Sequence, residues 1–206
     1  MPLVKKAPSP LPPAGETDWQ DQITRLQTGT PEERWSAARA LAAYPQAATA
    51  LGEALDQQTD PRLREAIFTS LAKLNTESSF DAALRHLRAD DAQLRTGAYD
   101  AIVLMPAIIA QRLTALLHDE DPDIRILACD LARHIPPRQA APALAAILTT
   151  EPAVNVCAAA VDTLAETGGP AELPQLAQCA ARFSSEFFLN FSIKIASDRI
   201  NARAEA

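Results

Sequence analysis

Cysteine and histidine are the residue types in this chain best suited to act as nucleophiles, proton carriers or metal ligands. The sequence contains three of each: Cys129, Cys157, Cys179, His86, His118 and His134. No two histidines stand at the His-x-x-x-His spacing that would place both on one helical face around a metal ion. Cys157 lies in an alanine-rich run without a neighbouring histidine to take its proton. We therefore expect no catalytic residue, no metal site and no cofactor, and we interpret the cysteines as reduced core thiols.

Arginine recurs at a fixed spacing, which could form a ladder of guanidinium groups for a ligand. Arg34, Arg64, Arg95 and Arg125 are separated by 30, 31 and 30 residues, and Asn155 continues the series. An aspartate stands four residues before each of the last three arginines, which places a carboxylate one helical turn away. The pairs are Asp60 and Arg64, Asp91 and Arg95, and Asp121 and Arg125. We interpret these six residues as structural ion pairs and not as a ligand site.

The composition favours helices as the elements that carry these residues. Apolar residues make up 48% of the 206 residues, but aromatic residues make up only 5%. Alanine and leucine supply most of the apolar residues, whereas β-sheets are enriched in branched and aromatic side chains.

The charge and the hydropathy pattern argue against several classes of partner. The formal net charge is −7, whereas phosphate binding needs clustered Lys and Arg. No run approaches the 18 or so apolar residues of a membrane span, and the N-terminus lacks the apolar stretch of a signal peptide. We expect a cytoplasmic protein that binds neither nucleic acid nor membranes.

Proline recurs with a period of about 30 residues. Pro31, Pro61, Pro122 and Pro152 lie 30, 61 and 30 residues apart, and Asp91-Ala92 occupies the position where a proline is missing. Thr30, Asp60 and Asp121 are good N-caps, and the proline that follows each of them suits the first helical position. Each start precedes an apolar helical stripe, a break and a second, leucine-rich stripe. The period predicts stacked helix pairs, because one such unit cannot bury its own apolar face.

The chain divides into an arm and a repeat array. Residues 1–16 are rich in proline, and we predict a flexible arm there. We predict one solenoid over residues 17–200, with repeats near 30–59, 60–90, 91–120, 121–150 and 151–183, and a C-terminal capping helix over 184–200. The fifth repeat slips by about two residues, so its boundaries are the least regular.

The repeated phrase Asp-Pro-x-φ-Arg, in which φ is an apolar residue, resembles the HEAT repeat and the phycobilin-lyase type of HEAT-like repeat. It stands as Asp60-Pro61-Arg62-Leu63-Arg64 and as Asp121-Pro122-Asp123-Ile124-Arg125, with weaker copies at Pro31 and Pro152. The resemblance covers about residues 30–183. It implies an all-α, right-handed α-solenoid of about five helix pairs with capping helices at both ends. It also implies that the aspartates and arginines tie neighbouring repeats together.

Proteins similar to this one serve as scaffolds, adaptors and assembly factors. We therefore expect a non-enzymatic protein that binds an unidentified partner protein on its concave face, which the second helices line in similar solenoids. Candidate contacts there are Arg85, Arg88, Gln111 and Arg112, of which the arginines form a basic spot on an acidic protein. A solvated face is the alternative.

The predicted C-terminal helix holds most of the phenylalanines. Phe187, Phe191 and Ile195 follow at spacings of four and predict a stripe that closes the last repeat. Phe188 stands beside that stripe, and we consider it as an exposed anchor for a partner.

Two further functions remain open. The likeness to the phycobilin-lyase repeat suggests a factor that attaches or removes a bilin, although no acid–base pair stands out in the sequence. A helical-repeat DNA glycosylase is the third alternative, and the acidic charge argues against it.

Overall fold

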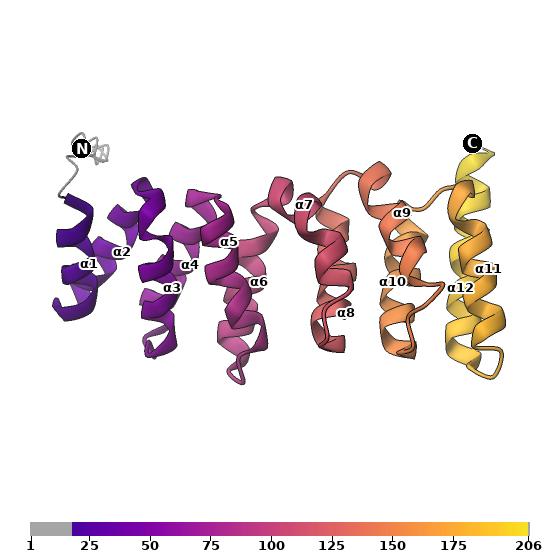
Figure 1. Cartoon of the computed structure of the whole chain (residues 1–206), viewed down its shortest axis with the longest axis horizontal. Coiled ribbons are helices and arrows are strands. Elements are labelled where there is room, and N and C mark those ends of the chain that lie inside the picture. The colour runs from indigo at the N-terminus through magenta and orange to yellow at the C-terminus, as the bar shows by residue number, and fades with distance from the viewer. Residues whose placement is uncertain (1–17, 206) are drawn as a thin grey trace, which may run out of the picture.

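The computed structural model describes residues 18–205, so the predicted proline-rich arm over residues 1–16 lies outside them. Every regular element within 18–205 is a helix, and the helices stack side by side along one long axis (Figure 1). The predicted all-α solenoid is therefore confirmed.

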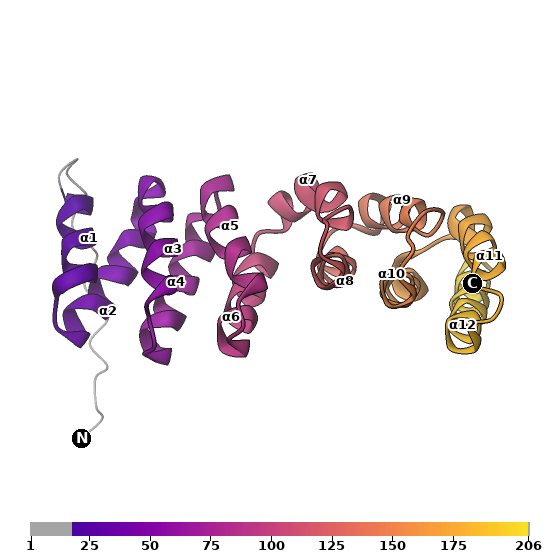
Figure 2. The same ribbon diagram turned by 60° about the horizontal axis from the view of Figure 1, so that its bottom comes forward.

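Five helix pairs make up the middle of the chain. They are α2 (Pro31–Ala40) with α3 (Ala48–Asp56), α4 (Pro61–Leu74) with α5 (Glu77–Leu84), α6 (Ala92–Val103) with α7 (Pro106–Leu117), α8 (Pro122–Leu131) with α9 (Pro137–Ile147), and α10 (Val154–Thr167) with α11 (Leu173–Arg182). Helix α1 (Asp18–Thr28) precedes them and α12 (Phe187–Ala204) follows them. Short 3-10 segments include η1 (Leu41–Ala43), η2 (Pro45–Ala47), η3 (Arg85–Arg88), η4 (Ala132–His134) and η5 (Pro170–Glu172). In Figure 2 the second helices α7 and α9 lie on one side, and the first helices α8 and α10 lie on the other.

Side chains at the helix starts explain why the first helices begin where they do. The Glu33 N–H donates to Thr30 Oγ1 at 3.4 Å, and the Thr30 N–H donates to Glu33 Oε2 at 2.8 Å, which completes a capping box. Asp60, Asp91 and Asp121 each accept a hydrogen bond from the N–H two residues later, at 2.8 to 3.0 Å. The fifth first helix has no side-chain cap and begins at Val154, two residues after Pro152.

One apolar core runs through the stack. Leucines of the second helices, such as Leu51, Leu113 and Leu144, are fully buried between the two layers. Helix α12 occupies the position of a further first helix and packs along α10. The core therefore continues one helix beyond the fifth pair.

The stacking is interrupted once, in the middle of the array. Helix α4 packs closely against α6, and α8 packs closely against α10, but α6 and α8 stay further apart. Long polar side chains bridge this gap: the Tyr99 hydroxyl on α6 donates to Asp130 Oδ2 on α8 at 2.5 Å. Arg112 on α7 reaches back to Glu77 and Asp81 on α5 at 3.0 and 2.9 Å. We call these contacts the polar seam.

Within residues 18–205 no single helix is long and apolar enough to cross a membrane, and α6 and α7 meet that test only as a pair, bent by 117°.

Candidate interaction surfaces

The cysteines and histidines do not form a reactive cluster. All three cysteines are buried, and burial raises the pKa of Cys129 to about 12. A contact with Cys179, together with burial, raises the pKa of the Cys157 thiol. Burial lowers the pKa of His86, whose Nε2 lies 3.2 Å from the Gly52 carbonyl oxygen. No group of three His, Cys, Asp or Glu side chains in the described part of the chain is placed to hold a metal ion.

The periodic arginines bind the ends of the preceding repeats. The guanidinium groups of Arg64, Arg95 and Arg125 each donate to the carbonyl six residues earlier, at 2.6, 2.6 and 2.9 Å. Arg34 likewise donates to the Leu26 carbonyl at 2.9 Å. The arginines therefore close the loop between one repeat and the next.

The ion pairs differ from those that the spacing suggested. Arg64 pairs with Asp91 of the following repeat, Nη1 to Oδ2 at 2.7 Å, and not with Asp60 one turn before it. Within residues 18–205, Arg95 makes no ion pair with Asp91, and Arg125 makes none with Asp121. The physical reason is that Asp60, Asp91 and Asp121 turn their carboxylates toward the N–H groups at the helix start.

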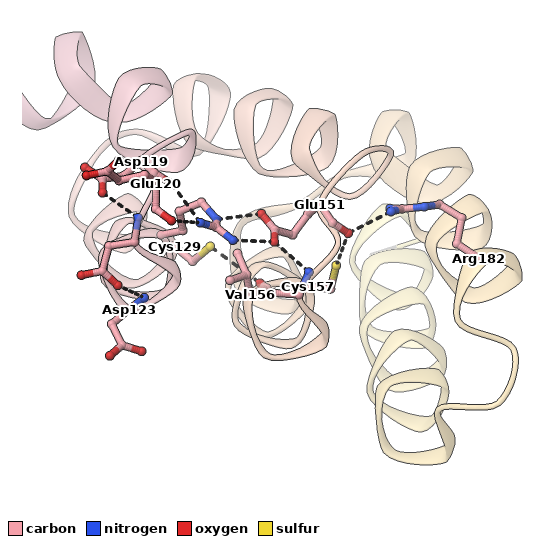
Figure 3. Close-up of polar contacts among 11 residues, drawn as sticks. Asp119, Glu120, Asp123, Cys129, Glu151, Val156, Cys157 and Arg182 are labelled. Atoms are coloured by element: carbon pink, nitrogen blue, oxygen red, sulfur yellow. Dashed lines mark hydrogen bonds and ion pairs between the residues drawn. The ribbon is translucent and has the colours of Figure 1, made fainter.

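Arg125 and Glu151 form the most enclosed ion pair of the array (Figure 3). The contact is bidentate, with Arg125 Nε and Nη2 each 2.9 Å from a Glu151 oxygen, and the Glu151 side chain is only 5% exposed. Burial pushes the pKa of Glu151 upward, but hydrogen bonds from Arg125 and from the Ala153 N–H outweigh it and hold the pKa below its ordinary value. This pair fastens the fourth repeat to the fifth.

In the fifth repeat an arginine from a different helix binds the loop that the periodic arginine binds in the other repeats. Asn155 stands where the series would place an arginine. Arg182, at the end of α11, instead donates to the Leu148 carbonyl at 2.5 Å and to the Glu151 carbonyl at 2.8 Å. Figure 3 shows Arg182 reaching Glu151, the residue whose carboxylate binds Arg125. The spacing of the arginines could not predict that Arg182 binds this loop, because Arg182 is not part of the periodic series.

Two of the three predicted basic contacts are already paired within the protein. Arg88 donates to Asp119 at 2.5 Å, and Arg112 is held by two carboxylates of the polar seam. Arg85 is looser, with its Nη2 3.8 Å from Asp56 Oδ2, and Gln111 is exposed on α7. The structure therefore does not gather these residues into a free basic patch.

An apolar groove of about 320 Å³ lies between α4 and α6. Phe68, Ala72, Ala101 and Leu104 form its apolar lining, and Leu104 is 64% exposed. The rim carries Arg64, Glu65, Gln93 and Asp100. The Phe68 ring lies directly on Gly97, where a Cβ atom would stand 2.5 Å from the ring. The sequence pattern did not predict this groove, although Gly97 inside a helical pattern is a signal of a close approach between helices.

The C-terminal helix is oriented differently from the prediction. Leu189, Ile193, Ala196 and Ile200 are the buried residues of α12. Phe187 and Phe191, predicted to close the last repeat, are 75% and 56% exposed, so that prediction is wrong. Phe188 is 84% exposed, which agrees with the hypothesis that this side chain lies at the surface. We call Phe187, Phe188 and Phe191 the phenylalanine patch.

A family model described as HEAT repeats matches residues 22–103 and 109–186, which is well over half of the chain. The chain belongs to the HEAT repeat family. The two matched segments of this HEAT array meet near the junction of α6 and α7, beside the polar seam.

The HEAT array is also similar to several solved repeat structures. The complex of CpcE and CpcF of phycocyanin lyase from a Nostoc species aligns with 97% of this chain and 100% of its own, at 16% identity and a TM-score of 0.39. A designed armadillo repeat protein covers 87% of this chain and 98% of its own, at 14% identity and a TM-score of 0.41. An engineered protein covers 90% and 97%, at 16% identity and a TM-score of 0.40. No curated protein sequence matches the chain.

Proposed function

We propose that this HEAT-repeat chain is a non-enzymatic scaffold that holds a segment of a partner protein in the groove between α4 and α6. The observation that carries the proposal is the apolar lining of that groove with Leu104 at its edge, 64% exposed. A large exposed leucine beside an apolar groove is typical of a binding site for an apolar side chain. The groove lies between two first helices, so the proposed site differs from the face of the second helices that the repeat resemblance suggested.

The charges at the rim suggest what kind of segment fits. Glu65 and Asp100 are exposed at the rim, whereas Arg64 is tied to Asp91. The chain as a whole carries a formal charge of −7. A segment with an apolar anchor flanked by Lys or Arg would be complementary to this rim. Arg85 and Gln111, on the side of the second helices, remain candidate contacts for the rest of the partner.

A capture experiment tests this function. Full-length protein and the Leu104→Lys variant are immobilised, and proteins retained from the native host are compared. Thr114→Lys is the matched control, because Thr114 is exposed on α7 and does not line the groove. We expect a partner that the wild type and Thr114→Lys retain and that Leu104→Lys loses. Equal retention by Leu104→Lys, or retention of nucleic acid or small molecules alone, would contradict the proposal.

The bilin alternative stays a prediction. Mixing the protein with free bilin should change the absorbance spectrum of the pigment if that alternative holds. An unchanged spectrum removes it.

A further inference from the structure

Helix α12 is apolar on two opposite sides. Its inner side, formed by Leu189, Ile193, Ala196 and Ile200, is buried against the preceding helices. Phe187, Phe191 and Ile195 follow at spacings of four, and at 100° per residue they point about 150° away from the inner side. Phe188 lies beside this stripe. The phenylalanine patch is thus the outward side of the last helix within residues 18–205.

The two described ends of the array differ in this respect. The exposed residues of α1 are polar, and include Gln20, Asp21, Thr24 and Gln27. A polar outer face is what a terminal repeat needs in order to stay solvated. Helix α12 instead presents three phenylalanines on the side where a next first helix would stack, and nothing within residues 18–205 covers them.

We propose that the phenylalanine patch is the interface of a two-fold dimer, in which α12 packs antiparallel on α12 of a second copy. Centring the pair on Phe191 places this residue against Phe191 of the second copy. Residues four positions to either side then lie opposite each other, so Ile195 meets Phe187 and Phe188 of the second copy. A two-fold axis gives such a self-complementary contact without any other partner.

The charges on α12 are compatible with this pairing. The outward side carries no charged residue from Phe187 to Phe191. Asp198 lies on the same side two turns further on, beyond the residues that pair, and forms an ion pair with Lys194 on the flank at 2.8 Å. In the antiparallel arrangement Lys194 lies beside Phe187 of the second copy, where its ammonium group can interact with the ring. Identical charges do not face each other, and the two helix dipoles run in opposite directions.

The exposed area is enough for a weak dimer. A phenylalanine side chain contributes roughly 150–250 Å² on burial, so the three exposed fractions amount to about 300–500 Å² per chain. Two copies with their flanking residues approach the ~1,200 Å² at the lower limit of specific interfaces. We therefore expect reversible association in the micromolar range and not a permanent dimer.

Sedimentation velocity of the full chain from about 1 to about 100 µM tests the dimer, since association at such an interface depends on concentration. The wild type should shift from monomer to dimer over this range. Phe188→Asp should remain monomeric, with unchanged helical circular dichroism because Phe188 is exposed. Leu104→Asp is the matched control, since it alters another large exposed apolar residue, which lies in the groove and is 64% exposed, and it should still dimerise. This control also separates the dimer from the proposed partner site.

Cross-linking gives the geometry of the interface. The native cysteines are all buried, so a thiol introduced at Phe191→Cys is the accessible one among residues 18–205. Mild oxidation by a small disulfide should join two Phe191→Cys chains rapidly, the disulfide taking up the two electrons and two protons. Asp198→Cys should not cross-link, because the rise of 1.5 Å per residue puts its two copies about 20 Å apart along the helix pair.

Several outcomes would overturn the dimer. A wild type that stays monomeric at every concentration would do so, as would dimers that Phe188→Asp leaves intact. Cross-linking of Asp198→Cys at the same rate as Phe191→Cys would reject the two-fold pairing. A monomeric wild type whose Phe188→Asp variant loses a captured protein would assign the patch to that protein instead.

Discussion

At the scale of single residues, the periodic arginines hold the loops between repeats through hydrogen bonds to loop carbonyl groups. A guanidinium group offers five N–H donors in a fixed plane, so one side chain can bind loop carbonyls and a carboxylate together. Arg125 does both, since Nη1 binds the Asp119 carbonyl while Nε and Nη2 bind Glu151. A lysine at this position would supply charge without the bidentate geometry.

Neutralising Glu151 should lower stability in a way that depends on pH. The pKa of Glu151 is held below its ordinary 4.5, so its stabilising effect is complete above that pH and is lost as the pH falls through the lower folded pKa. We expect Glu151→Gln to lower the free energy of unfolding by about 1.5–3 kcal/mol near pH 7, the range for a hydrogen bond to a charged group. Near pH 3.5 the difference from the wild type should shrink.

Urea unfolding at several pH values measures this effect. Glu120→Gln is the control, because it removes the same charge from an exposed side chain in the neighbouring loop. Glu120→Gln should stay within about 0.5 kcal/mol of the wild type. A Glu151→Gln variant as stable as Glu120→Gln at neutral pH would show that the ion pair does not stabilise the fold.

The sequence predicted which residues recur but not which atoms they would meet. The period identified Asp60 and Arg64 correctly as a repeated pair of positions. Their sequence separation suggested an ion pair within one helix, because four residues make one turn. The helix start competes for the same carboxylate, and Asp60 accepts from the Arg62 N–H at 3.0 Å. Only the stacking of repeats brings Asp91 within 2.7 Å of Arg64.

At the scale of elements, the helix starts were the most predictable feature. Pro31, Pro61 and Pro122 begin α2, α4 and α8, because a proline after a capping residue fits only the first turn. Helix α12 shows the limit of such reasoning. Both of its sides have the period of a helix, so local pattern cannot decide which one is buried. Leu189, Ile193, Ala196 and Ile200 are the residues buried as α12 packs along α10, and this tertiary contact is absent from the local pattern of α12.

The two sides of α12 should differ in their contribution to stability. Ile193→Ala removes a side chain that is 5% exposed and should cost about 2–5 kcal/mol, the range for a buried isoleucine. Phe191→Ala should change the free energy of unfolding by no more than about 0.5 kcal/mol, since its ring is 56% exposed. Thermal melts at one low protein concentration compare them, so that self-association does not contribute. A Phe191→Ala protein that melts as early as Ile193→Ala would place the ring in the core.

At the scale of the whole molecule, the array consists of two closely packed blocks joined at the polar seam. In a solenoid each repeat contacts only its neighbours, so stability depends on the weakest interface as much as on the repeats. Across the seam, Tyr99 and Arg112 bridge helices that stay apart, and the ion pairs of Arg112 are partly exposed to solvent. Partly exposed ion pairs are weak and are screened by salt. We infer that this interface limits the cooperativity of unfolding.

Removing the seam contacts should therefore let the two blocks unfold separately. Both tryptophans, Trp19 and Trp35, lie in α1 and α2, so their fluorescence reports on the N-terminal block, whereas circular dichroism reports on every helix. In urea the two signals of the wild type should follow one transition. In Arg112→Gln, which loses the contacts to Glu77 and Asp81, we expect the midpoints to separate, because the coupling between the blocks falls.

The matched control removes an arginine of similar pairing that does not cross the seam. Arg133 binds Asp130, Asp162 and Glu166, all within the C-terminal block, and its removal leaves Asp130 Oδ2 free to accept from Tyr99 across the seam. Arg133→Gln should lower the stability of that block without a comparable loss of coupling at the seam. At high salt the two midpoints of the wild type should separate as well, since the seam ion pairs are partly exposed and are screened, whereas Arg112→Gln should respond less to salt. Coincident transitions in Arg112→Gln, or an equal separation in Arg133→Gln, would show that the closely packed helices and not the seam determine how the molecule unfolds.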